Sequence, residues 1–323
     1  MKAIIWTNYG SPDVFQLQEV DKPTPKDNEV LIKVHAATAF AGDCELRRLD
    51  LPLLIRVPLR LYAGLIKPKR VTVLGQELAG EIEAVGKAVT KFKKGDQIFA
   101  SAGLRFGAYA EYKCLPESAV ISIKPASISY DEAAAIPTGG TEALHYLRKG
   151  NIQKGEQILI NGAGGSIGTF VVQLAKHFGA EVTAVDHADK LDMLRSIGAD
   201  HVIDYTHEDF AAKEERYDLV FDSVGKKSFE RCVKALKPDG RYLLASPNPR
   251  TRIRGRRVSR SSGKKVIIES VEPTIEDLNY LAGLIEAGTI KVVIDKRYPL
   301  EQTAEAHRYV ESGQKKGHVI ITV

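Results

Sequence analysis

A glycine-rich turn between an apolar segment and an amphipathic one constrains this chain more than any other feature. The segment 157–161, apolar at 158–160, leads into glycines at positions 162, 164, 165 and 168, and a helical pattern continues to residue 178. Small residues let the backbone turn tightly and approach a pyrophosphate, and the N–H groups at a helix N-terminus attract phosphate oxygens. The spacing therefore predicts a strand, a turn and a helix that bind a dinucleotide, with a merely tight turn as the alternative.

An acidic residue follows the next apolar segment. Asp186 comes directly after residues 182–185 and 24 residues after Gly162, where a carboxylate would bind the ribose hydroxyls of an adenosine. A carboxylate there repels a 2′-phosphate, so Asp186 weakly favours NADH over NADPH. Asp186 could instead cap the helix that begins near residue 189, and Lys190 could receive a 2′-phosphate, so both cofactors stay open.

The pattern of apolar segments changes near residue 126. Before it, short segments such as 30–35 and 78–85 are separated by Pro and Gly, which indicates a mostly antiparallel β domain. After it, apolar runs of four or five residues alternate with helical patterns, which predicts a parallel sheet with right-handed crossovers. The last apolar segment, 317–323, is expected to rejoin the first domain.

Composition and charge exclude several classes of protein. The 323 residues suggest two domains, and no apolar run is long enough to span a membrane. Three dispersed cysteines are too few for a disulfide framework, so we expect a cytoplasmic protein. Eight Lys and Arg in residues 250–265 exceed the whole net charge of +5. We interpret this basic stretch as a solvated loop, with cofactor phosphates or an acidic partner as the alternative and nucleic acid or an anionic membrane as the least favoured one.

Several segments, in order, resemble the medium-chain dehydrogenase/reductase superfamily and its zinc-independent quinone oxidoreductase-like branch. They are residues 75–86, 92–96, 107–111, the glycine turn and 198–205, and the resemblance covers essentially the whole chain. It implies an α/β fold in which a Rossmann doubly wound parallel sheet (residues 126–289) is inserted into a mostly antiparallel β, GroES-like catalytic domain (1–125, completed by 290–323). It also implies an active site between the two domains and a homodimer.

The resemblance also bears on zinc. Zinc alcohol dehydrogenases of this superfamily have Cys, His and Cys where this chain has Phe40, Gln76 and Thr138, none of them a good Zn²⁺ ligand in this context. The four cysteines of the family's structural zinc lobe are also missing around 95–111. We therefore expect no zinc. Without a Lewis acid, a quinone or enone is a more suitable hydride acceptor, because its reduced anion is delocalised.

The resemblance supplies candidates for the reacting site. Asp43 and Gln76 match positions that line the family's substrate cleft, although Asp43 could simply cap the helix that follows it. Tyr62 lies in the apolar segment 51–68. This segment is either a lid over a hydrophobic quinone, with Tyr62 as a proton donor, or a segment that packs or contacts another subunit.

Contacts with both ends of the cofactor are also implied. Tyr205 matches the family tyrosine near the adenosine end, or packs on the sheet as an aromatic residue at a strand end. Glu142 replaces the threonine that contacts the nicotinamide end in the family, and Thr141 is its possible substitute. The residues expected to bind the cofactor are therefore Thr141, Gly162, Gly164, Gly165, Ser166, Ile167, Gly168, Asp186, Lys190 and Tyr205.

Together these features predict a zinc-independent oxidoreductase that transfers hydride from NAD(P)H to a quinone or an α,β-unsaturated carbonyl. One alternative is an NAD(P)-dependent alcohol or aldehyde reductase, against which the missing zinc ligands argue. The other is a weakly active protein of the same fold that senses the cofactor or binds nucleic acid, since a fold does not fix a function and Glu142 could disable the chemistry. None of the eight histidines has a spacing suited to a metal or is favoured for catalysis.

Overall fold

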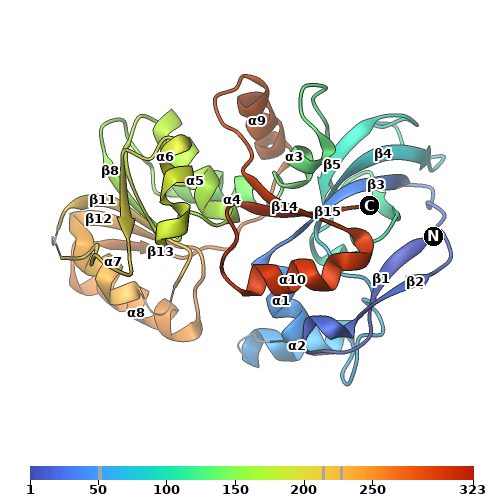
Figure 1. The fold of residues 1–323 in the computed structure, drawn as a ribbon, viewed down its shortest axis with the longest axis horizontal. Helices are drawn as coiled ribbons and strands as arrows, with labels where there is room; N and C mark the ends of the chain where they lie inside the picture. The colour runs from blue at the N-terminus through green and yellow to red at the C-terminus, as the bar shows by residue number, and fades with distance from the viewer. Residues whose placement is uncertain (50–52, 213–214, 226–227) are drawn as a thin grey trace. The chain divides into compact units, whose positions relative to one another are not determined.

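The computed structural model describes residues 1–49, 53–212, 215–225 and 228–323 (Figure 1). The chain forms two compact units. The first consists of Met1–Thr138, Pro273–Glu286 and Ile294–Val323, and the second of Gly139–Glu272 and Ala287–Val293. Within the described residues, no helix has both the length and the apolar character needed to cross a membrane.

The second unit is built on a six-stranded parallel sheet with the order β10-β9-β8-β11-β12-β13. Its strands are β8 (Gln157–Asn161), β9 (Glu181–Asp186), β10 (His201–Asp204), β11 (Tyr217–Asp222), β12 (Leu236–Leu244) and β13 (Lys265–Ile267). The side chains of the central strand β8 at positions 158–160 are completely buried, as expected where helices cover both faces of a parallel sheet. Numbered along the chain, the order is 3-2-1-4-5-6, so the predicted doubly wound sheet is confirmed.

The helices of this unit follow the predicted alternation with strands, except that α8 (Pro249–Ser261) was not predicted. They are α4 (Gly139–Lys149), α5 (Ser166–His177), α6 (Leu191–Ser196), α7 (Phe229–Ala235) and α8 (Pro249–Ser261). The interpretation of residues 250–265 as a loop is wrong, because most of them form α8. Asn248 caps this helix by accepting a hydrogen bond from the Thr251 N–H at 3.0 Å, and arginine is itself a good helix former.

The first unit contains the predicted antiparallel sheet. Its strand order is β14-β15-β3-β4-β5-β7, with β6 paired to β3 and a separate hairpin of β1 and β2. The strands are β1 (Lys2–Trp6), β2 (Phe15–Glu19), β3 (Glu29–Ala39), β4 (Glu77–Val85), β5 (Gln97–Ser101), β6 (Tyr112–Pro116), β7 (Val120–Ile123), β14 (Ile294–Pro299) and β15 (His318–Thr322). Val319 of β15 pairs with Ala39 of β3, which confirms that the last segment rejoins this sheet.

Two helices of the first unit lie within the range assigned above to the dinucleotide-binding domain. The helices are α1 (Ala41–Arg48), α2 (Leu53–Ala63), α3 (Tyr130–Ala134), α9 (Ile275–Glu286) and α10 (Thr303–Glu311). The fully buried Ala133 and Ala134 belong to α3, which packs on β3, β4 and β5. Ser122 of β7 donates a hydrogen bond to Asn279 of α9. These contacts tie α3 and α9 to the antiparallel sheet, whereas the expected bounds had placed both in residues 126–289.

Candidate active site

The glycine turn has the geometry of a phosphate-binding turn. Gly162 follows β8 with a φ of +81°, a conformation that side chains disfavour. A Cβ at Gly168 would lie 2.4 Å from the carbonyl oxygen of Gly162 and 2.6 Å from that of Ala163, so α5 packs directly against the turn. Gly165 begins this helix and has no side chain with which to cap it. The residues therefore fit a pyrophosphate at the N-terminus of α5.

Asp222 fixes the neighbouring strand end, at the point where the strand order reverses. Its Oδ1 accepts a hydrogen bond from Asn161 Nδ2 at 2.9 Å, and its Oδ2 accepts one from Ser228 Oγ at 2.6 Å. The hydroxyl of Tyr242 and the N–H of Gly225 also donate to this carboxylate. Because ligands of doubly wound sheets bind outside the carboxyl ends of the strands at this point, Asp222 supports the floor of the candidate site.

Asp186 is held by the protein itself. Its Oδ2 accepts the N–H of Gly164 at 2.7 Å, and its Oδ1 accepts the N–H of His187 at 2.9 Å and lies 3.0 Å from Lys190 Nζ. The Asp186 carboxylate thus connects the glycine turn to Lys190, the side chain that could receive a 2′-phosphate. The residue that caps the following turn is His187, whose Nδ1 accepts from Asp189, so Asp186 is not the cap considered above.

The two other cofactor candidates differ in exposure. Tyr205 is 50% exposed, its N–H donates to the carbonyl of Asp186 at 3.3 Å, and its ring lies 6.3 Å from that of His187. Tyr205 therefore lies beside Asp186, with half of its surface exposed. Thr141 is buried in the first turn of α4, and Glu142 beside it is half-buried.

Asp43 and Gln76 meet in the first unit. Asp43 lies in the first turn of α1 and is completely buried, and its Oδ1 accepts a hydrogen bond from Gln76 Nε2 at 3.2 Å. Burial raises the pKa of the Asp43 carboxyl to about 7, although the hydrogen bonds from Tyr109 and Gln76 oppose this shift. Phe40 is the N-cap residue of α1, so Asp43 is not its cap.

Tyr109 and His307 complete this cluster, and sequence reasoning missed both. Tyr109 Oη lies 2.9 Å from Asp43 Oδ2 and 3.1 Å from Nε2 of His307, which lies on α10. Nη1 of Arg47 lies 3.1 Å from His307 Nδ1, and its Nη2 forms an ion pair with Glu311. The one available signal was local, because Asp43 and Arg47 are four residues apart and share a face of α1.

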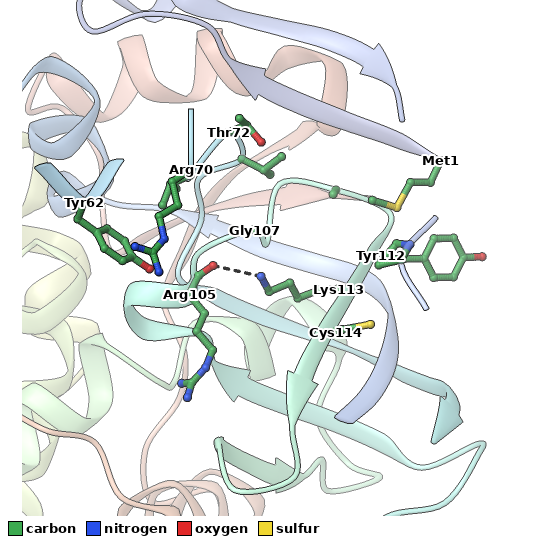
Figure 2. A pocket seen from close by; sticks show the side chains of 13 residues that line it. Met1, Tyr62, Arg70, Thr72, Arg105, Gly107, Tyr112, Lys113 and Cys114 are labelled. Carbon is green, nitrogen blue, oxygen red and sulfur yellow. Dashed lines mark hydrogen bonds between the residues drawn. The ribbon is translucent and has the colours of Figure 1, made fainter. Parts of the chain in front are cut away.

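Tyr62 lies elsewhere in the first unit, on α2. It lines a groove of about 360 Å³, with Arg70 beside it at one end and Met1 and Tyr112 at the other (Figure 2). Its hydroxyl, on a residue 37% exposed, donates to the Leu104 carbonyl at 3.3 Å. The described residues that line the groove include neither Asp43 nor Gln76. Of the expected segment 51–68, residues 51 and 52 lie outside the described residues.

The three positions of the family's zinc ligands hold other contacts. Phe40 is the N-cap residue of α1, the Gln76 amide donates to Asp43, and the Thr138 N–H donates to the Glu77 carboxylate. Throughout the described part of the chain, there is no group of three or more His, Cys, Asp or Glu side chains that could hold a metal ion.

Comparison with known proteins agrees with this geometry. The family described as "Alcohol dehydrogenase GroES-like domain" matches residues 26–125, and the one described as "Zinc-binding dehydrogenase" matches 197–321. The 2-methylene-furan-3-one reductase of Solanum lycopersicum is 34% identical, and the chloroplastic NADPH-dependent alkenal/one oxidoreductase of Arabidopsis thaliana is 32% identical. Each alignment covers 99% of this chain and 79% of the relative.

Solved structures of known proteins support the same family and fold. The quinone oxidoreductase from Coxiella burnetii matches with a TM-score of 0.90 and 28% identity, over 100% of this chain and 99% of the other. The chain therefore belongs to the medium-chain dehydrogenase/reductase superfamily, in its quinone oxidoreductase-like branch. The family and fold predicted from the sequence are confirmed.

Proposed function

We infer that this chain is an NAD(P)H-dependent oxidoreductase that reduces quinones or α,β-unsaturated carbonyls. The observation that carries this conclusion is the strand, glycine turn and helix at the reversal of the strand order. It occurs in a chain whose relatives over 99% of its length are named as reductases of a methylene-furanone and of alkenals and alkenones. The alcohol or aldehyde reductase remains the alternative enzyme.

The second unit binds the cofactor in this proposal. When bound, the reduced nicotinamide supplies the hydride. The N–H groups of the turn and of the first residues of α5 hold the pyrophosphate, and Gly162 and Gly168 keep side chains out of its way. Tyr205 lies at the adenosine end and Thr141 toward the nicotinamide end.

The first unit serves the acceptor without zinc. Phe40, Gln76 and Thr138 offer no set of good Zn²⁺ ligands, and the Gln76 amide is already oriented by Asp43. In this proposal the NH2 group of Gln76 donates to the carbonyl oxygen of the acceptor, on which negative charge develops as the hydride arrives. Protonation then comes from solvent or from Tyr62, and Tyr62→Phe lowers turnover in the second case only.

Cofactor choice depends on the pair of Asp186 and Lys190. The Asp186 carboxylate weakly favours NADH, but its partners Gly164, His187 and Lys190 occupy much of its capacity to accept further hydrogen bonds. Asp186→Ser removes the repulsion of a 2′-phosphate and the ion pair between Asp186 and Lys190. We expect the ratio of kcat/KM for NADPH to that for NADH to rise about tenfold, the effect of one charge-assisted hydrogen bond. The matched variant Lys190→Met should move this ratio in the opposite direction.

Steady-state oxidation of each cofactor tests the proposal. The purified protein should oxidise NADH or NADPH with a 1,4-quinone or an alkenal, and a metal chelator should leave the rate unchanged. Absence of turnover with a panel of quinones and enals, or reduction of simple aldehydes only in a zinc-loaded sample, would contradict the proposal. The absence of turnover combined with a salt-sensitive RNA shift would favour the binding protein considered above.

We further propose a homodimer in the cytoplasm, as expected from the family and from the three dispersed cysteines. Cys44 and Cys232 are buried, and burial raises the pKa of the Cys44 thiol to about 12, so these thiols suit a reducing compartment. Light scattering of the eluted protein during gel filtration tests the dimer, because a mass near 35.5 kDa would identify a monomer instead.

A further inference from the structure

A continuous line of hydrogen bonds connects α10, near the end of the chain, to Asp43. Arg47 Nη1 lies 3.1 Å from His307 Nδ1, and His307 Nε2 lies 3.1 Å from Tyr109 Oη. Tyr109 Oη in turn lies 2.9 Å from Asp43 Oδ2. All four side chains have an exposed fraction of 0%, so their polar atoms depend on one another for partners.

Arg47 fixes the direction of this line, because a guanidinium can only donate. His307 Nδ1 must therefore accept, and the ring hydrogen is on Nε2, from which it is donated to Tyr109 Oη. The hydroxyl hydrogen of Tyr109 then points to Asp43 Oδ2 or to the Thr38 carbonyl oxygen, 3.1 Å away. Each hydrogen bond donated along the line thus polarises the next donor, which strengthens the hydrogen bond that Tyr109 can donate to Asp43.

The other oxygen of Asp43 determines how Gln76 is oriented. While Asp43 is a carboxylate it can only accept, so the amide nitrogen of Gln76 faces it and the amide oxygen faces away. A proton on Asp43 Oδ1 would be donated to that amide oxygen, and the amide would turn its NH2 group away from Asp43. On the side away from Asp43, Gln76 therefore presents its amide oxygen beside one remaining N–H in one state of Asp43 and its whole NH2 group in the other.

We propose that His307 and Arg47 are positioning residues, which act through Tyr109 to set the protonation of Asp43 and thereby the end of the Gln76 amide that faces the substrate. This inference rests on the proposed function, in which Gln76 meets the carbonyl of a quinone or enone. Hydride arrival leaves negative charge on that oxygen, which requires a donor. Turnover is therefore fastest while Asp43 is protonated.

Asp43 is the acid of this line, and its surroundings bring its pKa near neutral pH. Burial raises the pKa of Asp43 to about 7, the hydrogen bonds from Tyr109 and Gln76 lower it, and the charge of Glu77 on β4 raises it. Burial also raises the pKa of Glu77, whose carboxylate accepts from Thr38 Oγ1 and the Thr138 N–H.

The remaining titratable groups keep one state. Burial, and then the charge of Arg47, lower the pKa of His307 to about 3, so its ring is neutral. The Cys44 thiol, 3.3 Å from His307 Nδ1, also stays protonated because burial raises its pKa to about 12. Arg47 is paired with Glu311.

The pH profile of kcat tests this inference in the holoenzyme. With NADPH and a 1,4-quinone, kcat of the wild type should fall as the pH rises through the pKa of Asp43. Tyr109→Phe removes a donor to the Asp43 carboxylate, so the inflection should move to higher pH by about 1. A purely structural role of Tyr109 would lower stability and leave the inflection where it is.

Two substitutions of His307 provide the control. The side-chain amide of His307→Gln can accept from Arg47 and donate to Tyr109, so its inflection should stay near that of the wild type. His307→Leu cannot, and its inflection should move in the same direction as that of Tyr109→Phe. His35→Gln changes a half-buried histidine that stacks on Tyr130 outside this line, and it should leave the profile unchanged.

A measurement on the unmodified protein keeps the inference testable where a variant fails to fold. In ¹⁵N NMR spectra, His307 should carry its hydrogen on Nε2 and remain neutral throughout the neutral and mildly acidic range. A hydrogen on Nδ1, a charged ring, or an unmoved inflection in folded Tyr109→Phe would overturn the inference. Failure of the proposed function would give a different result. No quinone or enal would then be turned over, although His307 would still carry its hydrogen on Nε2.

Discussion

The two candidate sites of this protein are built in opposite ways. The glycine turn of the second unit is local, since Gly162, Gly168 and Asp186 lie within one strand-turn-helix-strand unit and act mainly through the backbone. The Asp43 cluster of the first unit is assembled from distant segments, since Arg47 and His307 are 260 residues apart and bond through side chains. A local site can be deduced from spacing, whereas a dispersed one needs the folded chain.

The largest effect is expected for Arg47→Met, which tests whether the dispersed cluster depends on its buried side-chain contacts. It leaves His307, Glu311 and the Gly10 carbonyl oxygen without their buried cationic donor, and breaking such a buried pair costs about 3–5 kcal/mol. Urea unfolding monitored by Trp6, the single tryptophan and a buried residue of the first unit, measures the loss. The matched variant Arg48→Met removes a 39% exposed partner of the same Glu311, and it should cost less than about 1 kcal/mol. Equal losses would refute the special role of Arg47.

A smaller effect is expected at the local site. Gly168→Ala places a methyl group against the carbonyl oxygens of Gly162 and Ala163, so the turn must shift at a cost of about 1–3 kcal/mol. Binding of NADPH, measured by calorimetry, should weaken more than tenfold. Gly283→Ala in α9 is the control, because nothing lies within 4 Å of its added Cβ and alanine favours a helix by about 1 kcal/mol. Unchanged NADPH binding in Gly168→Ala would contradict the phosphate-binding role of the turn.

The effect that should be smallest near neutral pH is a change in the pH dependence of stability. The pKa of His307 is lowered from 6.5 to about 3 in the folded protein, so its contribution to stability is complete above pH 6.5 and is lost as the pH falls toward 3. Within this window the slope is up to about 1.4 kcal/mol per pH unit. His307→Gln has no proton to gain, so its stability, measured by urea unfolding at a series of pH values, should fall less steeply with acid. Parallel curves for the two proteins would exclude this linkage.

The same contrast explains how far the sequence analysis could go. The parallel sheet and the glycine turn were predictable, because apolar runs and glycine spacing report the local conformation of the backbone. Tyr109 and His307 were missed, since nothing near either residue signals a partner about 200 residues away. The basic stretch was misread for another reason: its charge was weighed, while the helix propensity of arginine and the cap at Asn248 were not.

The position of α10 and β15 along the chain affects how the protein is made. In the antiparallel sheet, β15 pairs with β3. The buried Arg47 of α1 bonds to His307 and Glu311 of α10. Both β15 and α10 are encoded after residue 293. During synthesis the ribosome delivers the whole parallel-sheet unit before these pieces emerge. The antiparallel-sheet unit, which contains Met1–Thr138, can therefore complete its fold only after the parallel-sheet unit has been made.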